Sequence, residues 1–469
     1  MLFPTLDFAL FFVAVFAVSW LLVRWRAPRH WFLIAASYFF YGYWDWRFCG
    51  LLLFASLTAW LAGLALDNTA DPLRRKWITG LACSILLAVL GFFKYFGFFI
   101  ESLRPILESV GFGRDMLLMQ IVLPVGISFF TFQAISYVVD VHRGEVEART
   151  SPGDLLLYVS FFPQLVAGPI VRASHFLPQL DRPPLVTRRM MIFGLVISLF
   201  GLVKKMVIAN YLAADLVDKI FFDPSAFSSL ELLVAVYGYA VQIYCDFSGY
   251  SDMAIGTAAL LGYRFRPNFR QPYRSASLRE FWRRWHISLS QWLRDYLYKP
   301  LGGSHHGTLN TYRNLILTML LGGLWHGAAW TFVAWGLLHG VGLALERAVS
   351  RGREAASGAF THALSVIFIF HVVCAGWILF RAANFATAAD YFAGLTRLSV
   401  SGEAITGFSL LLIASSLAMQ FAPEKLPFGI TGMLSRRPLW LTAIVFALWL
   451  LVADWIAPPG TAPFIYFQF

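Results

Sequence analysis

Two histidines have the residue type and the surroundings that acid–base chemistry needs. His326 lies in the segment 322–330 (GGLWHGAAW), near the centre of an apolar stretch. An ionisable side chain is costly to place there and rarely faces lipid, and neutral imidazole suits proton abstraction near pH 7. The flanking glycines permit close backbone approach or a break in the helix. We therefore predict a catalytic role for His326; the alternative is a histidine that bonds a neighbouring helix and only packs.

The second candidate, His286, lies in a strongly basic segment. Residues 263–314 hold ten Arg and Lys against two acidic residues, so ten minus two, or +8, of the net charge of +11 falls there. Residues 277–280 (SLRE) have the spacing of a capping box that starts a helix. An apolar stripe follows, formed by Trp282, Trp285, Leu289, Trp292, Leu293 and Tyr296. We expect one amphipathic helix in the membrane interface, with its tryptophans at headgroup level.

The opposite stripe of this expected helix is polar. It consists of Arg279, Arg283, His286, Ser290 and Arg294. On such a stripe His286 either takes part in the reaction directly or is only a solvated residue. The arginines bind either anionic lipid headgroups or an anionic donor such as a CoA phosphate, and both interpretations stay open.

A polar run, 246–252 (DFSGYSD), interrupts another apolar segment. Asp246 and Ser248 within it belong either to a polar pathway inside the helix bundle or to helix–helix contacts. His339 follows His326 by thirteen residues, which is about 220° around a continuous helix. We therefore interpret His339 as structural.

Motifs of other catalytic and metal sites are missing. The chain has no GxxxxGK[ST], GxSxG, HExxH or HxxxxD pattern, and no Ser or Cys nucleophile with an evident paired base. His305 and His306 have no carboxylate or cysteine beside them, so no metal site is predicted. The four cysteines show no CxxC spacing and are expected to pack as free thiols.

The elements that position these residues must be membrane helices. Of 469 residues, 58% are hydrophobic, 17% aromatic and 13% charged, whereas soluble domains carry about 25% charged residues. The mean hydropathy is +0.65. We predict an all-α polytopic protein with a single membrane domain over 1–469 and about eleven spans. The expected spans are 3–23, 31–44, 48–66, 78–100, 117–139, 190–213, 230–262, 315–345, 362–380, 406–422 and 438–457.

The segments 155–171 and 315–345 are expected to be irregular. The charges of the loops predict how the chain is oriented in the membrane. The prolines and glycine of 155–171 indicate a broken or re-entrant segment. Basic residues gather in the loops 24–30, 67–77 and 172–189, whereas 214–229 is acidic. The positive-inside bias then places the N-terminus outside, provided that 315–345 is broken in mid-membrane. The same bias explains the net positive charge without a nucleic-acid partner.

Several segments together resemble one family over nearly the whole chain. They are 162–170 (FPQLVAGPI), 244–252 (YCDFSGYSD), 281–290 (FWRRWHISLS), 292–303 (WLRDYLYKPLGG), 323–328 (GLWHGA) and 464–469 (FIYFQF). With these segments the chain is similar to the membrane-bound O-acyltransferase (MBOAT) family, in its bacterial polysaccharide-acylating branch.

The resemblance implies a ring of helices with a tunnel in the bacterial inner membrane, where the loop charges predict a periplasmic N-terminus. It implies that His326 is the catalytic base and that His286 orients or polarises the acyl carbonyl. Residues expected to line the substrate path are Trp325, Trp330, Asp246, Ser248, Trp285 and Asn310, and those expected to bind the donor are Arg279, Arg283 and Arg294. The implied donor is acetyl-CoA with no bound cofactor. The implied partners are membrane lipid, a periplasmic esterase-like acetyltransferase and a polysaccharide acceptor, first of all alginate.

Three other functions compete with this one. A transporter or flippase would show internal repeats and charges that pair with substrate near the midplane, and neither is evident. D-alanyl transfer from a carrier protein would keep the fold and change the donor. A scaffold of a polysaccharide machine would need neither histidine.

Overall fold

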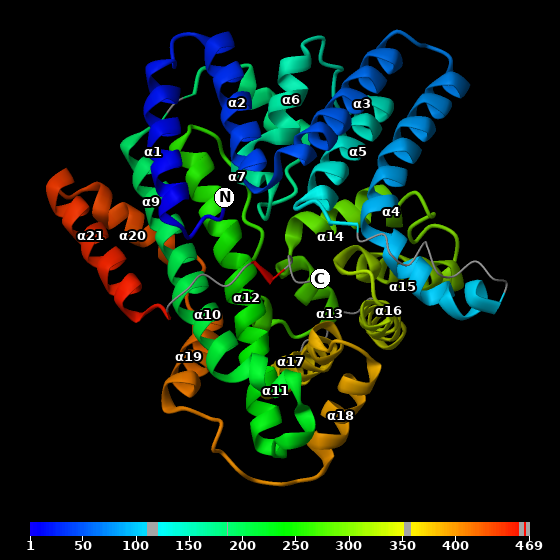
Figure 1. Cartoon of the computed structure of the whole chain (residues 1–469), viewed down its shortest axis with the longest axis vertical. Coiled ribbons are helices and arrows are strands. Elements are labelled where there is room, and N and C mark those ends of the chain that lie inside the picture. The colour runs from blue at the N-terminus through cyan, green and yellow to red at the C-terminus, as the bar shows by residue number, and fades with distance from the viewer. Residues whose placement is uncertain (110–120, 185, 351–357, 459–463, 466–469) are drawn as a thin grey trace. The chain divides into compact units, whose positions relative to one another are not determined.

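In the computed structural model the chain is helical, and it contains no strand among residues 1–109, 121–184, 186–350, 358–458 and 464–465, which are those the structure describes (Figure 1). Contacts divide the chain into two compact units. The first is Met1–Val186 with Leu260–Phe265, and the second is Thr187–Ala259 with Arg266–Phe469. Each unit is described by itself below, and the single membrane domain stays a prediction.

Among its described residues the first unit contains eight α-helices. They are α1 (Leu6–Leu21), α2 (Arg26–Asp45), α3 (Cys49–Asp67), α4 (Pro72–Ser109), α5 (Ile127–Arg143), α6 (Pro152–Ser160), α7 (Phe162–Leu165) and α8 (Ala173–Leu180). Helix α3 packs against α4, α5 and α6. The chain breaks between α6 and α7 at Phe161, whose ψ of 109° is not helical, as the prolines and glycine of 155–171 predicted. The start of the expected span 117–139 lies partly outside the described residues, and its helix begins only at Ile127.

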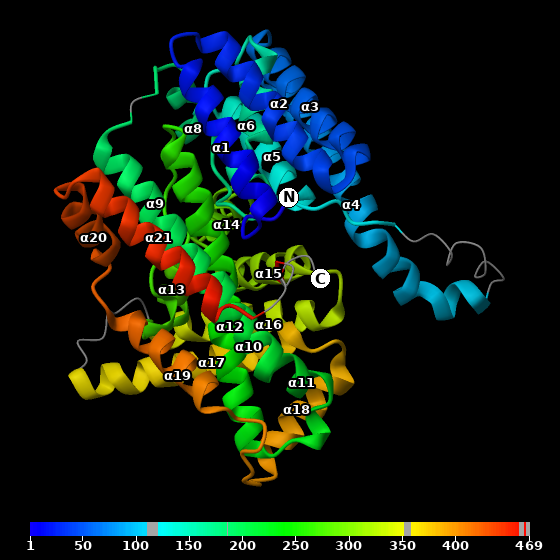
Figure 2. The same ribbon diagram turned by 60° about the vertical axis from the view of Figure 1, so that its left-hand side comes forward.

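The second unit holds all the candidate catalytic residues. Its longer helices are α9 (Arg188–Val203), α12 (Ser229–Leu260), α13 (Leu278–Arg284), α14 (Ile287–Leu293), α15 (Thr308–His326), α16 (Trp330–Ser350), α17 (Ala359–Arg381), α18 (Phe385–Thr396), α19 (Gly407–Ala418), α20 (Leu426–Ser435) and α21 (Leu439–Ile456). Shorter pieces continue α9, namely α10 (Asn210–Leu212) and α11 (Asp218–Phe222), joined through π-helical turns. Figure 2 shows α20 and α21 beside α9.

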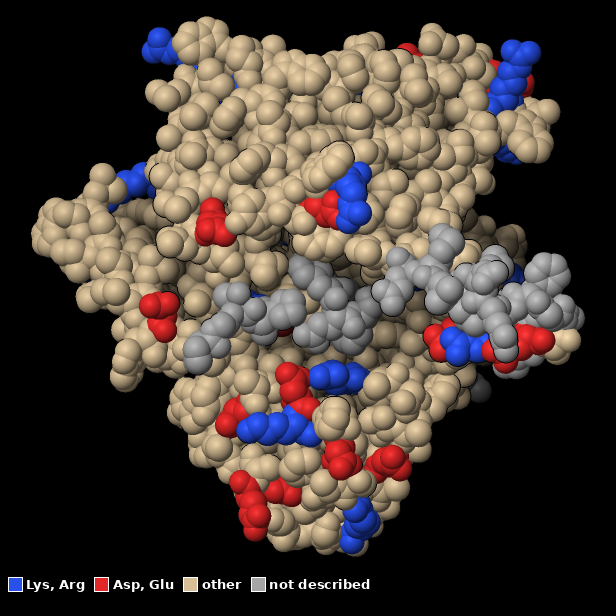
Figure 3. All heavy atoms as spheres, viewed as in Figure 1, with Lys and Arg blue, Asp and Glu red and all other residues tan. Residues whose placement is uncertain are grey.

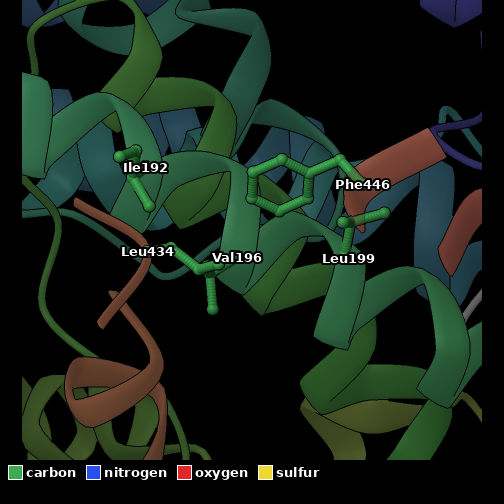
Figure 4. Packing of buried hydrophobic residues seen from close by; sticks show 5 residues of the cluster. All are labelled: Ile192, Val196, Leu199, Leu434 and Phe446. Carbon is green, nitrogen blue, oxygen red and sulfur yellow. The ribbon is translucent and has the colours of Figure 1, made fainter. Parts of the chain in front are cut away.

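Apolar side chains from three of these helices form one cluster. Ile192, Val196 and Leu199 of α9 pack toward Leu434 of α20 and Phe446 of α21, as Figure 4 shows. All five are buried. Spacings of four and three residues place the three α9 side chains on one helical face. This cluster explains why the C-terminal helices pack on α9 although few polar contacts join them.

Seven helices are long and apolar enough to cross a membrane, among the residues that the structure describes. They span Arg26–Asp67, Pro72–Arg104, Arg188–Phe222, Ser229–Leu260, Trp330–Val349, Ala359–Arg381 and Leu439–Ile456, with shorter apolar helices at Leu6–Leu21, Gly407–Phe421 and Leu426–Ser435. The all-α membrane architecture is confirmed, while the number of eleven spans stays a prediction. Figure 3 shows a face on which most side chains carry no charge. Large apolar side chains such as Leu10, Phe368 and Trp455 are exposed. Their exposure suits a surface that faces lipid.

Candidate active site

The expected continuous amphipathic helix is wrong, because the chain breaks at His286. Helix α13 ends at Arg284, α14 begins at Ile287, and His286 between them has φ 40° and ψ 56°. This left-handed conformation is unfavourable for a side chain with a Cβ, and it marks a position that its surroundings over-determine. The end of the expected helix also differs, since Arg294–Tyr298 form a π-helical turn.

The tryptophans of this segment are buried instead of standing at headgroup level. Trp282, Trp285 and Trp292 are at most 9% exposed. A three-to-four-residue stripe identifies the face that avoids water, but it does not say whether lipid or protein covers that face. Here protein does. The start of the helix agrees better with the prediction, since the Ser277 hydroxyl accepts a hydrogen bond from the Glu280 N–H at 3.1 Å.

Asn268 holds the ring of His286. Its side-chain oxygen lies 3.3 Å from His286 Nδ1 and accepts hydrogen bonds from the Ser288 N–H at 3.1 Å and the Ser288 hydroxyl at 2.9 Å. The Asn268 amide nitrogen donates to the Ser251 hydroxyl at 3.2 Å, which fixes the orientation of the amide. A carbonyl oxygen can only accept. The hydrogen bond therefore puts the imidazole proton on Nδ1 and leaves Nε2 as the basic nitrogen.

Electrostatics favour the neutral imidazole at His286. The residue is 0% exposed, and the rings of Phe247 and Phe269 contact it at centroid distances of 4.6 and 6.4 Å. Burial lowers the pKa of His286 from 6.5 to about 3, because charged imidazolium loses its hydration there. The ring is thus a neutral proton acceptor across the physiological pH range.

His326 ends α15 at the predicted break of the segment 315–345. Gly327 is extended, with φ −158° and ψ 150°, and α16 starts at Trp330. A Cβ added at Gly323 would lie 2.2 Å from the Phe332 carbonyl oxygen, and one added at Gly327 would lie 2.1 Å from the Phe332 ring. The glycines therefore let the end of α15 pack directly on the start of α16. This confirms that the segment is broken.

Aromatic rings enclose His326 and link it to His286. His326 is 3% exposed. The rings of Trp325, Trp335 and Phe380 contact its imidazole at 5.0, 4.9 and 5.3 Å. The ring of Trp325 also lies 5.8 Å from that of His286. The two histidines that the sequence singled out are thus neighbours of one tryptophan, in surroundings that exclude water.

Asp246 anchors the C-terminal segment beside His286. Its carboxylate forms a buried ion pair with Lys205 and accepts a hydrogen bond from the Ile465 N–H at 2.8 Å. The preceding residue, Phe464, contacts the ring of Phe247 at 5.6 Å, and Phe247 contacts His286. Lys205 lies in a π-helical turn, a feature often found at functional sites. Residues 466–469 of the matching terminal motif lie outside the described residues.

The other residues predicted to line the substrate path divide into buried and surface positions. Ser248 and Trp285 are buried, and the Trp285 ring stacks on Phe281 and contacts Trp377. Trp330 is 56% exposed at the first turn of α16. Asn310 lies on the surface side of α15 and donates to the His306 carbonyl at 2.7 Å. The structure therefore does not bring Trp330 or Asn310 into the buried group.

The three arginines predicted to bind a donor are exposed. Two of them already have carboxylate partners. Arg279 lies 4.0 Å from Glu346, and Arg294 forms two hydrogen bonds of 2.9 Å with Asp295. Within the described residues no three His, Cys, Asp or Glu side chains gather as metal ligands. The basic character of 263–314 is thus partly neutralised within the protein.

Sequence reasoning missed Asn268 and Lys205, both of which are buried. Asn268 lies in a loop eighteen residues before His286, and nothing in the local pattern links the two positions. Lys205 was counted within an apolar span, where a basic residue is itself a signal of a buried partner. That signal was available in the sequence, whereas the link from Asn268 to His286 required the fold.

These features define an integral membrane protein with two buried histidines whose imidazoles lie on either side of Trp325. The membrane-bound O-acyltransferase family model matches residues 125–383. A probable alginate O-acetylase AlgI of Pseudomonas putida is 39% identical over 498 aligned positions, covering 100% of both chains. The probable alginate O-acetylase AlgI of Pseudomonas aeruginosa is 43% identical over 83% of this chain and 73% of its own. The peptidoglycan O-acetyltransferase of Helicobacter pylori is 36% identical over 79% of this chain and 74% of its own.

The chain belongs to the membrane-bound O-acyltransferase family. It is therefore a multi-pass membrane acyltransferase, and the transporter and scaffold hypotheses lose their basis.

Proposed function

We propose that this protein transfers acetyl groups from acetyl-CoA at the cytoplasmic face of the bacterial inner membrane toward an exported polysaccharide, most directly alginate. The observation that carries the proposal is the pair of buried imidazoles around Trp325 in a chain of this family. The names of the two Pseudomonas relatives support alginate as the acceptor. The orientation with a periplasmic N-terminus rests on the loop charges.

In the proposed reaction His326 is the general base. Its imidazole removes the proton of an incoming hydroxyl, and that oxygen attacks the thioester carbonyl carbon. A C–O bond forms, the C–S bond breaks, and the leaving thiolate takes the proton back from His326. The enclosing aromatic rings support the step, because a site without water protects the thioester from hydrolysis. The hydroxyl belongs either to the sugar or to a serine of a periplasmic esterase-like partner.

We assign His286 the role of a second hydrogen-bond acceptor. Polarising a carbonyl would require an N–H at Nε2, but the bond to Asn268 keeps the proton on Nδ1. With its lone pair on Nε2, His286 can accept a hydrogen bond from a substrate donor other than the reacting hydroxyl, whose one proton goes to His326, and so help to orient the nucleophile. For the donor we propose Arg279, Arg283 and Arg294 as exposed groups that attract the CoA phosphates.

The test is polymer-bound acetyl ester in cells that carry His326→Ala, with membrane levels of the protein matched to wild type. The control is His305→Ala, at an exposed loop residue. Loss of the ester in the first variant and not in the second is expected. Ester near the wild-type level in His326→Ala would overturn the mechanism. Feeding membranes labelled acetyl-CoA or a labelled D-alanyl carrier protein separates acetyl transfer from D-alanyl transfer.

A further inference from the structure

Three aromatic rings with polar nitrogens are packed together next to the active site. They are Trp282 of α13 and Trp335 and His339 of α16, which are 9%, 0% and 0% exposed. Their ring centroids are 4.8 Å apart for Trp335 and His339, 5.2 Å for Trp282 and His339, and 5.7 Å for Trp282 and Trp335. Each ring contacts the other two, so we call this group the Trp–His–Trp cluster.

The nitrogens of this cluster have no hydrogen-bond partner among the described residues. This holds for both nitrogens of His339 and for the indole nitrogens of Trp282 and Trp335. Buried polar groups are nearly always hydrogen-bonded, because losing water without replacement is unfavourable. Four such atoms gather on three touching rings here, and this concentration points to a ligand that occupies the site.

The earlier interpretation of His339 as structural rested on a continuous helix from His326. That premise is wrong, since the chain breaks between α15 and α16. The Trp335 ring contacts both the His339 ring and the His326 ring, at 4.8 and 4.9 Å. The cluster therefore contacts the proposed base directly, through the ring of Trp335.

Gly376 of α17 closes the cluster from one side. A Cβ built on Gly376 would lie 3.1 Å from His339 Nε2 and 3.4 Å from Trp335 Nε1. Nitrogens from two different rings thus face the same point of α17. On another side the Phe281 ring lies parallel to His339 at 6.2 Å.

The donor and acceptor inventory limits what the ligand is. Two indole N–H groups and one imidazole N–H are donors, and the second imidazole nitrogen is an acceptor. A cation is disfavoured by three donors, and no basic side chain is among these rings to balance an anion. A neutral oxygen atom fits, because its two lone pairs accept hydrogen bonds from two of the three donors.

We propose that the Trp–His–Trp cluster is a binding site for one neutral oxygen atom beside the catalytic base. The oxygen is either a buried water or the carbonyl oxygen of the acyl group, the second source resting on the proposed function. Water would also donate to the acceptor nitrogen of His339, whereas a carbonyl would bind only to the N–H donors.

The first test is the sign of a stability change. His339→Phe keeps the ring and its packing on Phe281 and removes both nitrogens. If no ligand binds, this exchange removes unsatisfied buried groups, and the thermal unfolding midpoint stays equal or rises. The proposal predicts a lower midpoint, measured both without and with acetyl-CoA so that either source of the oxygen is tested, because the bound oxygen loses the His339 nitrogens that help to hold it. His371→Phe on α17 is the matched control, since His371 is exposed and its nitrogens bond to Tyr237 and to the Ile367 carbonyl.

The second test distinguishes the two sources of the oxygen. His326→Ala protein, which cannot turn over, is labelled with ¹⁵N-tryptophan and placed in nanodiscs. The NMR signals of the indole N–H groups are assigned with Trp282→Phe and Trp335→Phe. Shifts of both signals with acetyl-CoA and not with CoA identify the acyl carbonyl. Hydrogen-bonded signals that ignore acetyl-CoA identify water. Signals of free indole N–H under all conditions, together with an unchanged or raised midpoint in His339→Phe, would overturn the proposal. The stability test stands even if the proposed reaction is wrong.

Discussion

Asn268→Ala is expected to damage both stability and acyl transfer, although Asn268 lies outside every sequence motif. The Asn268 oxygen accepts hydrogen bonds from the Ser288 N–H and hydroxyl and from His286 Nδ1, at 3.1, 2.9 and 3.3 Å. The variant removes this acceptor from a site that is 0% exposed at His286. A buried donor that loses its acceptor costs about 1–3 kcal/mol. With two such N–H groups, we expect the unfolding free energy to fall by about 2–6 kcal/mol.

The effect on activity follows from the imidazole proton. Without the Asn268 oxygen, the proton on Nδ1 of His286 loses an acceptor at 3.3 Å, and the Ser288 hydroxyl at 3.5 Å is a weaker replacement. A hydrogen bond of this kind contributes about 0.5–1.5 kcal/mol, which corresponds to a loss of up to about tenfold in rate. The assays are the thermal unfolding midpoint in detergent and the acetyl ester formed per membrane-inserted protein.

Two further variants make this prediction sharper. Asn310→Ala is the matched control, because the amide of Asn310 makes one hydrogen bond, to the His306 carbonyl near the surface. We expect near wild-type stability and activity from it. Asn268→Asp keeps an acceptor for His286 but adds a charge, which raises the pKa of the imidazole; activity should then fall as the pH drops through that raised pKa. Wild-type midpoint and ester levels in Asn268→Ala would refute the reasoning.

Three other predictions test the same unit. Gly323→Ala places a methyl group 2.2 Å from a backbone oxygen of α16 and should lower the unfolding free energy by more than about 2 kcal/mol. The control is Gly432→Ala in α20, where a Cβ would have nothing within 4 Å. In the same thermal assay this control should be neutral or stabilising. Lys205→Met leaves the buried Asp246 carboxylate without its ion-pair partner and should lower the unfolding free energy by about 3–5 kcal/mol. The double variant Lys205→Met with Asp246→Leu should recover most of this loss. Equal unfolding midpoints for the single and double variants would contradict this prediction. Because burial lowers the pKa of His286 from 6.5 to about 3, the unfolded chain binds more protons at acid pH, so His286 should reduce the unfolding free energy by about 2 kcal/mol between pH 6.5 and pH 5. Calorimetric or optical melting over that range should show a flatter pH dependence in His286→Asn.

The sequence predicted the membrane class, the break near His326 and the two histidines. Hydropathy depends only on composition along the chain, so the apolar runs could be recognised without a fold. The glycines around His326 have a local cause, since a Cβ at Gly323 or Gly327 would collide with the start of α16. Such constraints act on residues close together in the chain and can therefore be predicted from the local sequence.

The tertiary structure decided which surroundings each polar residue meets. The periodic stripe around Trp282 and Trp285 could not say whether lipid or protein covers it, and no glycine or proline marks the break at His286. His286 is bonded to Asn268 and Asp246 is paired with Lys205, whereas His339 makes a ring contact with Trp335. Asn268 and Lys205 lie far from their partners along the chain, and Trp335, four residues before His339, gains its role only because it also contacts His326. Such contacts form because burial leaves polar groups few partners other than each other, and which groups meet depends on how the helices pack.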